Sequence, residues 1–182
     1  MYIDWEATQS SLWDYLLLMV QNLSDECRKL AEQNFIPLVD YVPDDEPLNL
    51  SNEDHLLFVI NYAKEKAADL IVIDTVSAAF DLLDENSNAE VKRYVMRPLK
   101  RLAREANAAV VFCHHTSKPH ESHTGELAYS GRGASAFGAL TRADFLLTRD
   151  KTKGDDYVVA RCTKAKCPKF EPVLWKLNRE RG

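Results

Sequence analysis

Polar side chains follow three apolar segments of the chain, and their types suit the activation of water. Asp4 and Glu6 end the first segment, Asp74 ends the second, and His114 and His115 end the third. Parallel strands place their carboxyl ends on one edge of a sheet, so these groups would meet at one crevice. Acids and imidazole there suit metal-assisted activation of water, with a carboxylate as the base. Singly, each residue has an ordinary structural explanation, as a solvated acid or as the cap of a loop.

The second segment, Leu70 to Ile73, is an unbroken aliphatic run that ends at Asp74. Such a run predicts a strand covered on both faces, which is typical of parallel sheets. Open α/β sheets bind their ligands beyond the carboxyl ends of the strands, where Asp74 falls. Burying an aspartate there costs free energy unless a cation, usually a metal ion, lies nearby. The alternative is that Asp74 only caps the following turn.

Predicted helices and strands alternate around these segments. Ser11 and Asp14 form the start signal of a helix that breaks near residues 22–24 and then continues. A short strand over residues 37–42 and a helix over residues 52–68 precede the central strand. This alternation is typical of a parallel sheet with helices packed against it.

The second half of the chain continues the alternation and then changes character. Ser87 starts another helix, which Pro98 interrupts with a kink or a late helix start. Residues 116–133 are polar, rich in glycine and without periodicity, which predicts a loop. A short helix is predicted over residues 134–140. Strands are predicted over residues 109–113, 143–148, 157–161 and 174–177. The fold class is therefore α/β, a mostly parallel sheet flanked by helices, with a β-rich C-terminal part.

Composition and charge are those of an ordinary globular protein. The 182 residues are 46% hydrophobic and 28% charged, with a formal net charge of −5. That charge argues against nucleic-acid binding through overall charge, although the C-terminal third carries a local basic stripe. No membrane span or signal pattern is present, so we expect a cytoplasmic protein with no membrane partner. We expect the four cysteines to be reduced: Cys27, Cys113, Cys162 and Cys167. Cys113 falls in a predicted strand and should be buried.

Three stretches resemble one family of ATPases. Residues 69–80 form the strand with the terminal aspartate, residues 110–118 form a strand ending in two histidines, and residues 130–135 contain an Arg-Gly-small-Ser element. Together they resemble the RecA-like ATPases of the RepA type, the plasmid and phage hexameric replicative helicases and their relatives. The resemblance covers nearly the whole chain. It implies one RecA-like ATPase core over residues 1–182, ATP and Mg²⁺ as cofactors, and a homo-oligomer that acts on DNA.

The resemblance also implies roles for single residues. Asp74 matches the aspartate that holds Mg²⁺ through water, with Thr75 beside it in the nucleotide site. Glu6 matches the glutamate thought to polarise the attacking water. His115 matches the sensor of the γ-phosphate, and we prefer it to His114 because it lies further from the strand.

Two cations would act on a neighbouring subunit. By the resemblance, Arg132 matches an arginine finger and Lys164 is similar to a second trans-acting cation. From the residues alone, Arg132 is a solvated loop arginine, and Lys164 and Lys166 belong to the charged outer face of a strand. The resemblance favours the trans-acting roles of Arg132 and Lys164.

The predicted loop corresponds to the central-channel loops that contact single-stranded DNA in ring helicases. Cationic and ring-bearing side chains there would contact phosphates and stack on bases. These candidate DNA-binding residues are Lys118, His120, His123 and Tyr129. Glu121 and Glu126 give the same loop negative charge.

One motif of the family is missing. A phosphate-cradling loop needs Gly-x-x-x-x-Gly-Lys-Ser/Thr, because glycines let backbone amides close around phosphate. None of the six glycines precedes a lysine, and the first of them is Gly125. We therefore interpret the chain as a core without the family's first strand, loop and helix, which should bind ATP poorly. Loss of that strand would expose an edge of the sheet. We expect a rearranged strand order, an intermolecular pairing or a dimer to cover this edge.

Three functions remain open at this point. The chain is the core of a RepA-like helicase-family ATPase whose reaction is ATP hydrolysis coupled to movement on DNA. Alternatively, it is a non-catalytic RecA-like module that binds nucleic acid or a protein. The third interpretation is a metal-dependent hydrolase that uses the acids and histidines on other phosphates.

Overall fold

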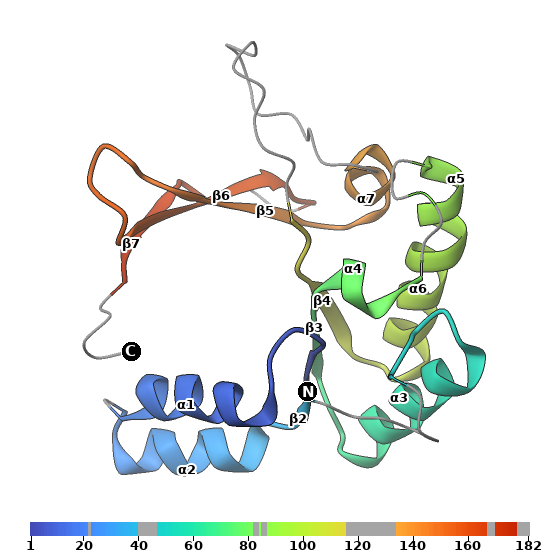
Figure 1. Cartoon of the computed structure of the whole chain (residues 1–182), viewed down its shortest axis with the longest axis horizontal. Coiled ribbons are helices and arrows are strands. Elements are labelled where there is room, and N and C mark those ends of the chain that lie inside the picture. The colour runs from blue at the N-terminus through green and yellow to red at the C-terminus, as the bar shows by residue number, and fades with distance from the viewer. Residues whose placement is uncertain are drawn as a thin grey trace.

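Two sheets of different type make up the molecule. The computed structural model describes residues 1–21, 23–39, 47–81, 84, 87–115, 134–166 and 170–177. These residues form a four-stranded parallel sheet flanked by helices and a separate three-stranded antiparallel sheet (Figure 1). The prediction of an α/β fold with a β-rich C-terminal part is therefore confirmed.

The parallel sheet has the strand order β2-β1-β3-β4. Its strands are β1 (Tyr2–Asp4), β2 (Pro37–Val39), β3 (Leu70–Asp74) and β4 (Ala109–Phe112). Asp4 of β1 is in register with Val39 on one side and with Asp74 on the other. β4 lies at one edge, where β3 is its partner among the strands that the structure describes. The sheet therefore brings the ends of β1, β3 and β4 to one side.

The two faces of the parallel sheet are covered unequally. On one face, Ile3, Ile71 and Ile73 are at most 1% exposed and belong to the main hydrophobic core. On the other face, Leu70 is 46% exposed and Val111 is 50% exposed. The prediction that the run from Leu70 to Ile73 is covered on both faces is therefore wrong, since its side chains alternate between a buried and an open face.

The helical pair α1 (Gln9–Val20) and α2 (Asp25–Asn34) connects β1 to β2 (Figure 1). Thr8 is the N-cap of α1, because its hydroxyl accepts the Ser11 N–H and the Ser11 hydroxyl accepts the Thr8 N–H. The predicted start at Ser11 is therefore late, and Ser11 rather than Asp14 completes the cap. Ser24 caps α2, which confirms the predicted break.

The core helices pack on the covered face of the parallel sheet. α3 (Glu53–Glu65) begins after Asn52, whose side chain accepts the Asp54 N–H at 2.9 Å. The short helix α4 (Val76–Ala79) follows β3 directly. Leu56, Ile60 and Ala63 on α3 are at most 3% exposed, as their helical spacing predicts.

A π-helical turn marks the position of Pro98. The segment runs from α5 (Asn88–Glu90) through the π-helical η2 (Val91–Met96) into α6 (Arg97–Glu105). The Arg97 N–H donates to the carbonyl of Lys92, five residues earlier. Pro98 follows in the first turn of α6, where its missing N–H is tolerated. The predicted disturbance at Pro98 is thus present.

The C-terminal part consists of one helix and three antiparallel strands, in the order β5-β6-β7. Their bounds are α7 (Ala134–Leu140), β5 (Asp144–Arg149), β6 (Tyr157–Lys164) and β7 (Val173–Lys176). β6 is longer than predicted, since it pairs with both neighbours. α7 joins this part to the core, because its Phe137 ring lies 5.7 Å from the ring of Phe112. Across the described ranges, none of the helices is both long enough and apolar enough to cross a bilayer.

Candidate functional site

The ends of β1, β3 and β4 form a rim of polar groups, as the parallel topology predicts. Asp4 and Asp74 face each other as register partners. The chain beyond β4 stays beside β3, because the Cys113 N–H donates to Ile73 and the Val76 N–H donates to the Cys113 carbonyl, both at 2.9 Å. Carboxylates from two strands and the residues after a third therefore share one sheet edge.

Asp4 holds the turn that presents Glu6. Its Oδ1 atom accepts the backbone N–H groups of Glu6 and Ala7, each at 2.8 Å. Asp4 is 9% exposed, so this carboxylate is largely used by its own turn. The sequence predicts Asp4 and Glu6 together as acids of one site, but their roles differ. Asp4 is a structural hydrogen-bond acceptor, and the Glu6 side chain extends beyond it.

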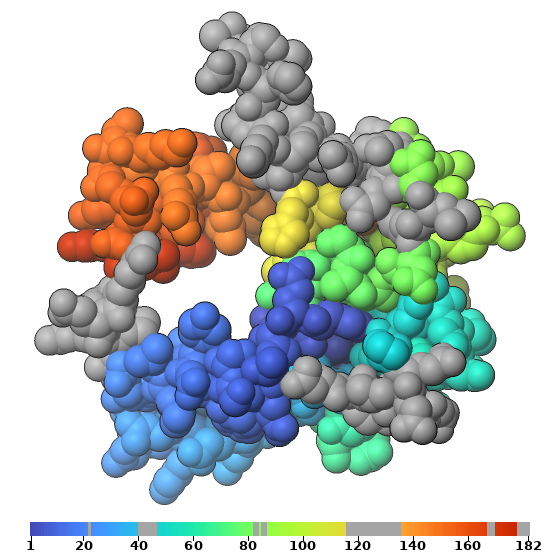
Figure 2. Space-filling model, in the orientation of Figure 1, coloured from blue at the N-terminus to red at the C-terminus, as the bar shows by residue number. Residues whose placement is uncertain are grey.

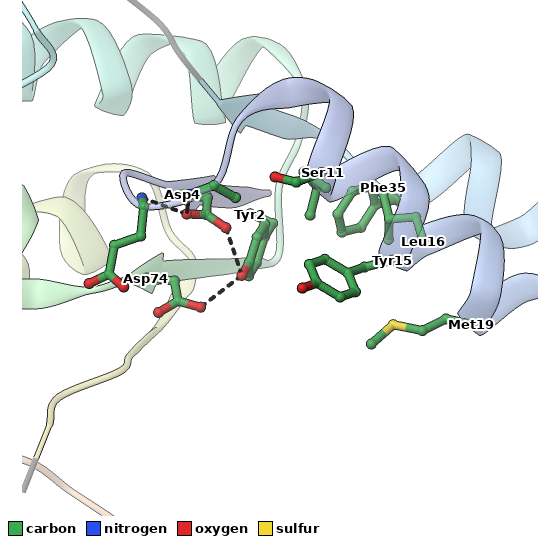
Figure 3. Close-up of a pocket in the computed structure, with 11 residues that line it drawn as sticks. Tyr2, Asp4, Ser11, Tyr15, Leu16, Met19, Phe35 and Asp74 are labelled. Carbon is green, nitrogen blue, oxygen red and sulfur yellow. Dashed lines mark hydrogen bonds between the residues drawn. The ribbon is translucent and has the colours of Figure 1, made fainter. Parts of the chain in front are cut away.

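Tyr2 links the two aspartates of the rim. Its hydroxyl donates to Oδ2 of Asp74 at 2.8 Å and lies 3.2 Å from Oδ2 of Asp4 (Figure 3). Burial, and then the two carboxylates, raise the pKa of Tyr2 above its ordinary value, so the hydroxyl remains a donor at neutral pH. Sequence reasoning missed Tyr2, although its position two residues before Asp4 on a strand puts both side chains on one face.

Glu6 lies where three segments meet. The Thr75 hydroxyl donates to Oε1 of Glu6 at 2.9 Å, and the same oxygen is 3.7 Å from Nε2 of His115. The Ser77 hydroxyl is 3.1 Å from the Thr75 hydroxyl, which extends the network into the start of α4. Thr75 is 2% exposed, whereas the Glu6 and His115 side chains are more than half exposed. A fixed, accessible carboxylate of this kind can accept a proton from water.

The two histidines after β4 point to different surroundings. His114 packs against the ring of Phe137, with the ring centroids 4.6 Å apart. His115 instead approaches Glu6. Of the two histidines, His115 is thus the one beside Glu6, and its role as a sensor stays a prediction.

Cys113 belongs to the rim and not to the core. The prediction of a buried Cys113 is wrong, because the residue is exposed on the open face of the sheet. Partial burial, and then the charge of Asp74, raise the pKa of its thiol from 9.0 to about 11. Cys113 is therefore a neutral thiol at physiological pH and a poor nucleophile.

A cavity of about 580 Å³ opens beside the rim (Figure 3). Tyr2, Asp4 and Asp74 line one side, and Tyr15 and Met19 of α1 line the other. The acids of the rim therefore face open space and not a packed interior.

Lys164 lies apart from the rim. Its Nζ donates to the carbonyl of Gly138 and, at 2.7 Å, to the carbonyl of Thr141. These carbonyls stand at the C-terminal end of α7, where a cation is favourable. The role predicted for Lys164 across a subunit boundary stays a prediction. The other predicted residues lie outside the described part of the chain: Arg132, Lys118, His120, His123 and Tyr129.

The donor groups of the rim fit a hydrated cation. Mg²⁺ keeps several waters and takes one or two carboxylates, a requirement that Asp74 meets. Within the described residues, no three acidic, histidine or cysteine side chains are grouped to hold a metal ion directly. The interpretation as a metal-dependent hydrolase stays a prediction. Thr75 and Asp74 offer contacts for a hydrated ion, but the described residues include no glycine-lysine cradle for phosphate.

Comparison with known proteins adds one finding. The family model described as an AAA domain matches residues 1–121, which include β1 to β4 and the whole rim. No curated protein matches the sequence.

Proposed function

The chain belongs to the AAA domain family, which is of the P-loop ATPase type, and on this premise we propose that it is an NTPase core related to RepA-type replicative helicases. In that family, ATP hydrolysis drives unwinding of DNA or movement along it. The observation that supports the proposal is the approach of Glu6, Thr75 and His115 at the end of β3, within 2.9 and 3.7 Å.

Each residue of the rim has a role in this proposal. Asp74, oriented by the Tyr2 hydroxyl, would hold the water shell of Mg²⁺, and the ion would supply positive charge beside the nucleotide phosphates. Glu6, held by Thr75, orients water and accepts its proton, while His115 contacts the γ-phosphate. Arg132 of a neighbouring copy supplies positive charge, and Lys164 adds to it when its Nζ leaves the carbonyls of Gly138 and Thr141; both roles require a homo-oligomer.

The missing phosphate cradle limits what this chain does alone. Backbone amides and a lysine normally bind the β- and γ-phosphates, and no glycine of this chain precedes a lysine. We propose that the chain by itself binds MgATP weakly and turns it over slowly. Isothermal titration should show no saturable binding of MgATP at micromolar concentrations, and a micromolar dissociation constant would contradict this.

The alternative is a non-catalytic RecA-like module that binds nucleic acid or a protein, which the same absence of the motif favours. The gene sequence upstream of Met1 distinguishes the two. An in-frame Gly-Lys-Ser/Thr motif favours the ATPase, and an independent ribosome-binding site favours the module. If the motif is found, the extended product should hydrolyse ATP, and Glu6→Gln should lower kcat by about 100-fold or more with little change in the affinity for MgATP. Equal activity of the extended wild-type product and its Glu6→Gln variant would show that Glu6 has no role in the mechanism.

A further inference from the structure

A second surface with chemistry of its own lies on the C-terminal sheet. In the strand pairing, Phe145 is opposite Cys162, and Trp175 is opposite Val158. Side chains alternate along a strand, so positions 158, 160 and 162 of β6 share one face. Phe145 and Trp175 therefore lie on that face too. We call it the aromatic face, and its members are Phe145, Leu147, Arg149, Phe170, Val173 and Trp175.

The rings of this face are exposed to solvent. Phe145 is 58%, Trp175 is 50% and Phe170 is 44% exposed. Phe145 and Phe170 stack on each other, with ring centroids 5.7 Å apart and planes 16° apart. Single exposed apolar residues are common on surfaces, but a group of aromatic rings on one small sheet is typical of a binding surface.

Strand geometry separates the two aromatic sites. Phe145 and Trp175 stand two strands apart and four positions along the ladder, which corresponds to roughly 16 Å. The stacked pair Phe145–Phe170 and the Trp175 ring therefore offer two platforms for two different planar groups. Arg149 lies in the same cross-strand row as Trp175, through Val158. A cation is thus carried in the same row as the Trp175 platform, two strand spacings or roughly 10 Å away.

The charge of the chain is divided unevenly between its two parts. Residues 1–140 contain 12 lysines and arginines against 22 acids, and residues 141–182 contain 11 against 6. The first part therefore carries −10 and the second +5, which together make the net charge of −5. A polyanion is therefore repelled by the first part, with its carboxylate rim, and attracted to the second, and the strand pairing puts one cation of the second part, Arg149, on the aromatic face.

From this combination we propose that the aromatic face binds single-stranded nucleic acid. Unpaired bases stack on the Phe145–Phe170 pair and on Trp175, and a phosphate between them contacts Arg149. In a duplex the bases are already stacked on each other, so the face selects single strands. A purely apolar protein partner would not require the positive charge of residues 141–182 or the arginine in the same row as Trp175. The C-terminal sheet that carries this surface is set apart from the part of the molecule that carries the rim (Figure 2), so binding on this face does not depend on ATP hydrolysis.

The test uses the full chain and a fluorescein-labelled oligothymidine, with binding followed by fluorescence anisotropy at low salt. Trp175→Ala should weaken binding by about fivefold or more, as expected for the loss of one stacked base. Trp13→Ala is the matched control, since Trp13 is 47% exposed on α1 in the acidic part and should leave the affinity unchanged. Arg149→Gln should reduce the slope of log K against log salt by about 1.

Further variants keep the test decisive. Phe145→Ala, on another strand, should also weaken binding by about fivefold if Trp175→Ala does not fold, and Trp175→Phe should retain most of the affinity. The proposal is overturned if the wild-type chain does not bind, if duplex DNA binds equally well, or if both tryptophan variants lose affinity equally. It is also overturned if Trp175→Ala leaves binding intact but changes the sedimentation of the chain, because the face would then belong to a second copy.

Discussion

The parallel and the antiparallel sheet of this molecule place functional groups in opposite ways. The parallel sheet gathers them at its end, where β1, β3 and β4 come from distant parts of the sequence and their side chains meet within 2.8 to 3.7 Å. The antiparallel sheet displays them on a face, where the neighbouring strands β5 to β7 expose rings that are not enclosed. The first arrangement suits chemistry on one bound group, and the second suits contact with an extended partner.

The comparison is sharpest when the same substitution is made in both parts. Leu102 of α6 is 0% exposed in the main core, and Leu147 of β5 is 61% exposed. Leu102→Ala should lower the free energy of unfolding by about 2 to 5 kcal/mol, because it removes buried contacts and leaves a cavity. Leu147→Ala should change it by less than about 0.5 kcal/mol. Urea denaturation followed by circular dichroism measures both.

Similar losses for the two variants would contradict the view that the face of the C-terminal sheet is solvent-exposed. In that case Leu147 would be covered in solution, and a second copy would be the first candidate. Sedimentation of the wild-type chain at several concentrations would then show whether a second copy covers Leu147.

A smaller effect is expected at the turn that presents Glu6. Asp4→Ala removes the acceptor of two backbone N–H groups, at Glu6 and Ala7, and should cost about 1 to 2 kcal/mol of unfolding free energy. Asp4→Asn retains an oxygen that can accept both hydrogen bonds, and it should cost less. Hydrogen exchange at the amides of Glu6 and Ala7 should accelerate in Asp4→Ala alone. Equal acceleration in both variants would show that the negative charge, and not the acceptor, holds the turn.

The smallest expected effect concerns Cys113. Because its pKa is raised to about 11, the folded protein keeps the thiol proton above pH 9, where the unfolded chain begins to lose it. The contribution of Cys113 to stability is therefore complete below pH 9 and is lost as the pH rises toward 11. Alkylation of Cys113 by iodoacetamide, followed by peptide mass spectrometry, should reach half its maximal rate near pH 11, with Cys27 as the internal comparator.

Asp74→Asn should lower this midpoint only in part, since burial is the larger cause of the raised pKa. Cys113→Ser should flatten the dependence of unfolding free energy on pH above 9. If the midpoint of alkylation lies at the ordinary pKa of a thiol, Cys113 does not lie beside the carboxylates.

Several parts of the fold could be predicted from local signals. The aliphatic run of β3, the helix break near residues 22–24 and the cap at Ser87 depend on residues close in sequence, and the structure agrees with each. The start of α1 could not, because Thr8 and Ser11 are both good caps and only their mutual hydrogen bonds decide between them. The open face of β3 also could not, since a run of apolar residues does not reveal which side the helices cover.

The candidate site was predictable in outline and not in detail. The approach of Glu6 to Thr75 and His115 follows from the rule that parallel strands end on one edge. The hydroxyl of Tyr2 against Asp74 depends on the pairing of β1 with β3, which the sequence does not show. The carbonyls around Lys164 likewise depend on how α7 packs against β6.

The ammonium of Lys164 has a mechanical consequence for the molecule. One side chain at the tip of β6 holds the last turn of α7 through two carbonyls, and α7 in turn packs on the core through Phe137. Lys164 is therefore one of the contacts between the basic sheet and the acidic body. Through α7 and Phe137 it links whatever binds on the sheet to the packing of the core.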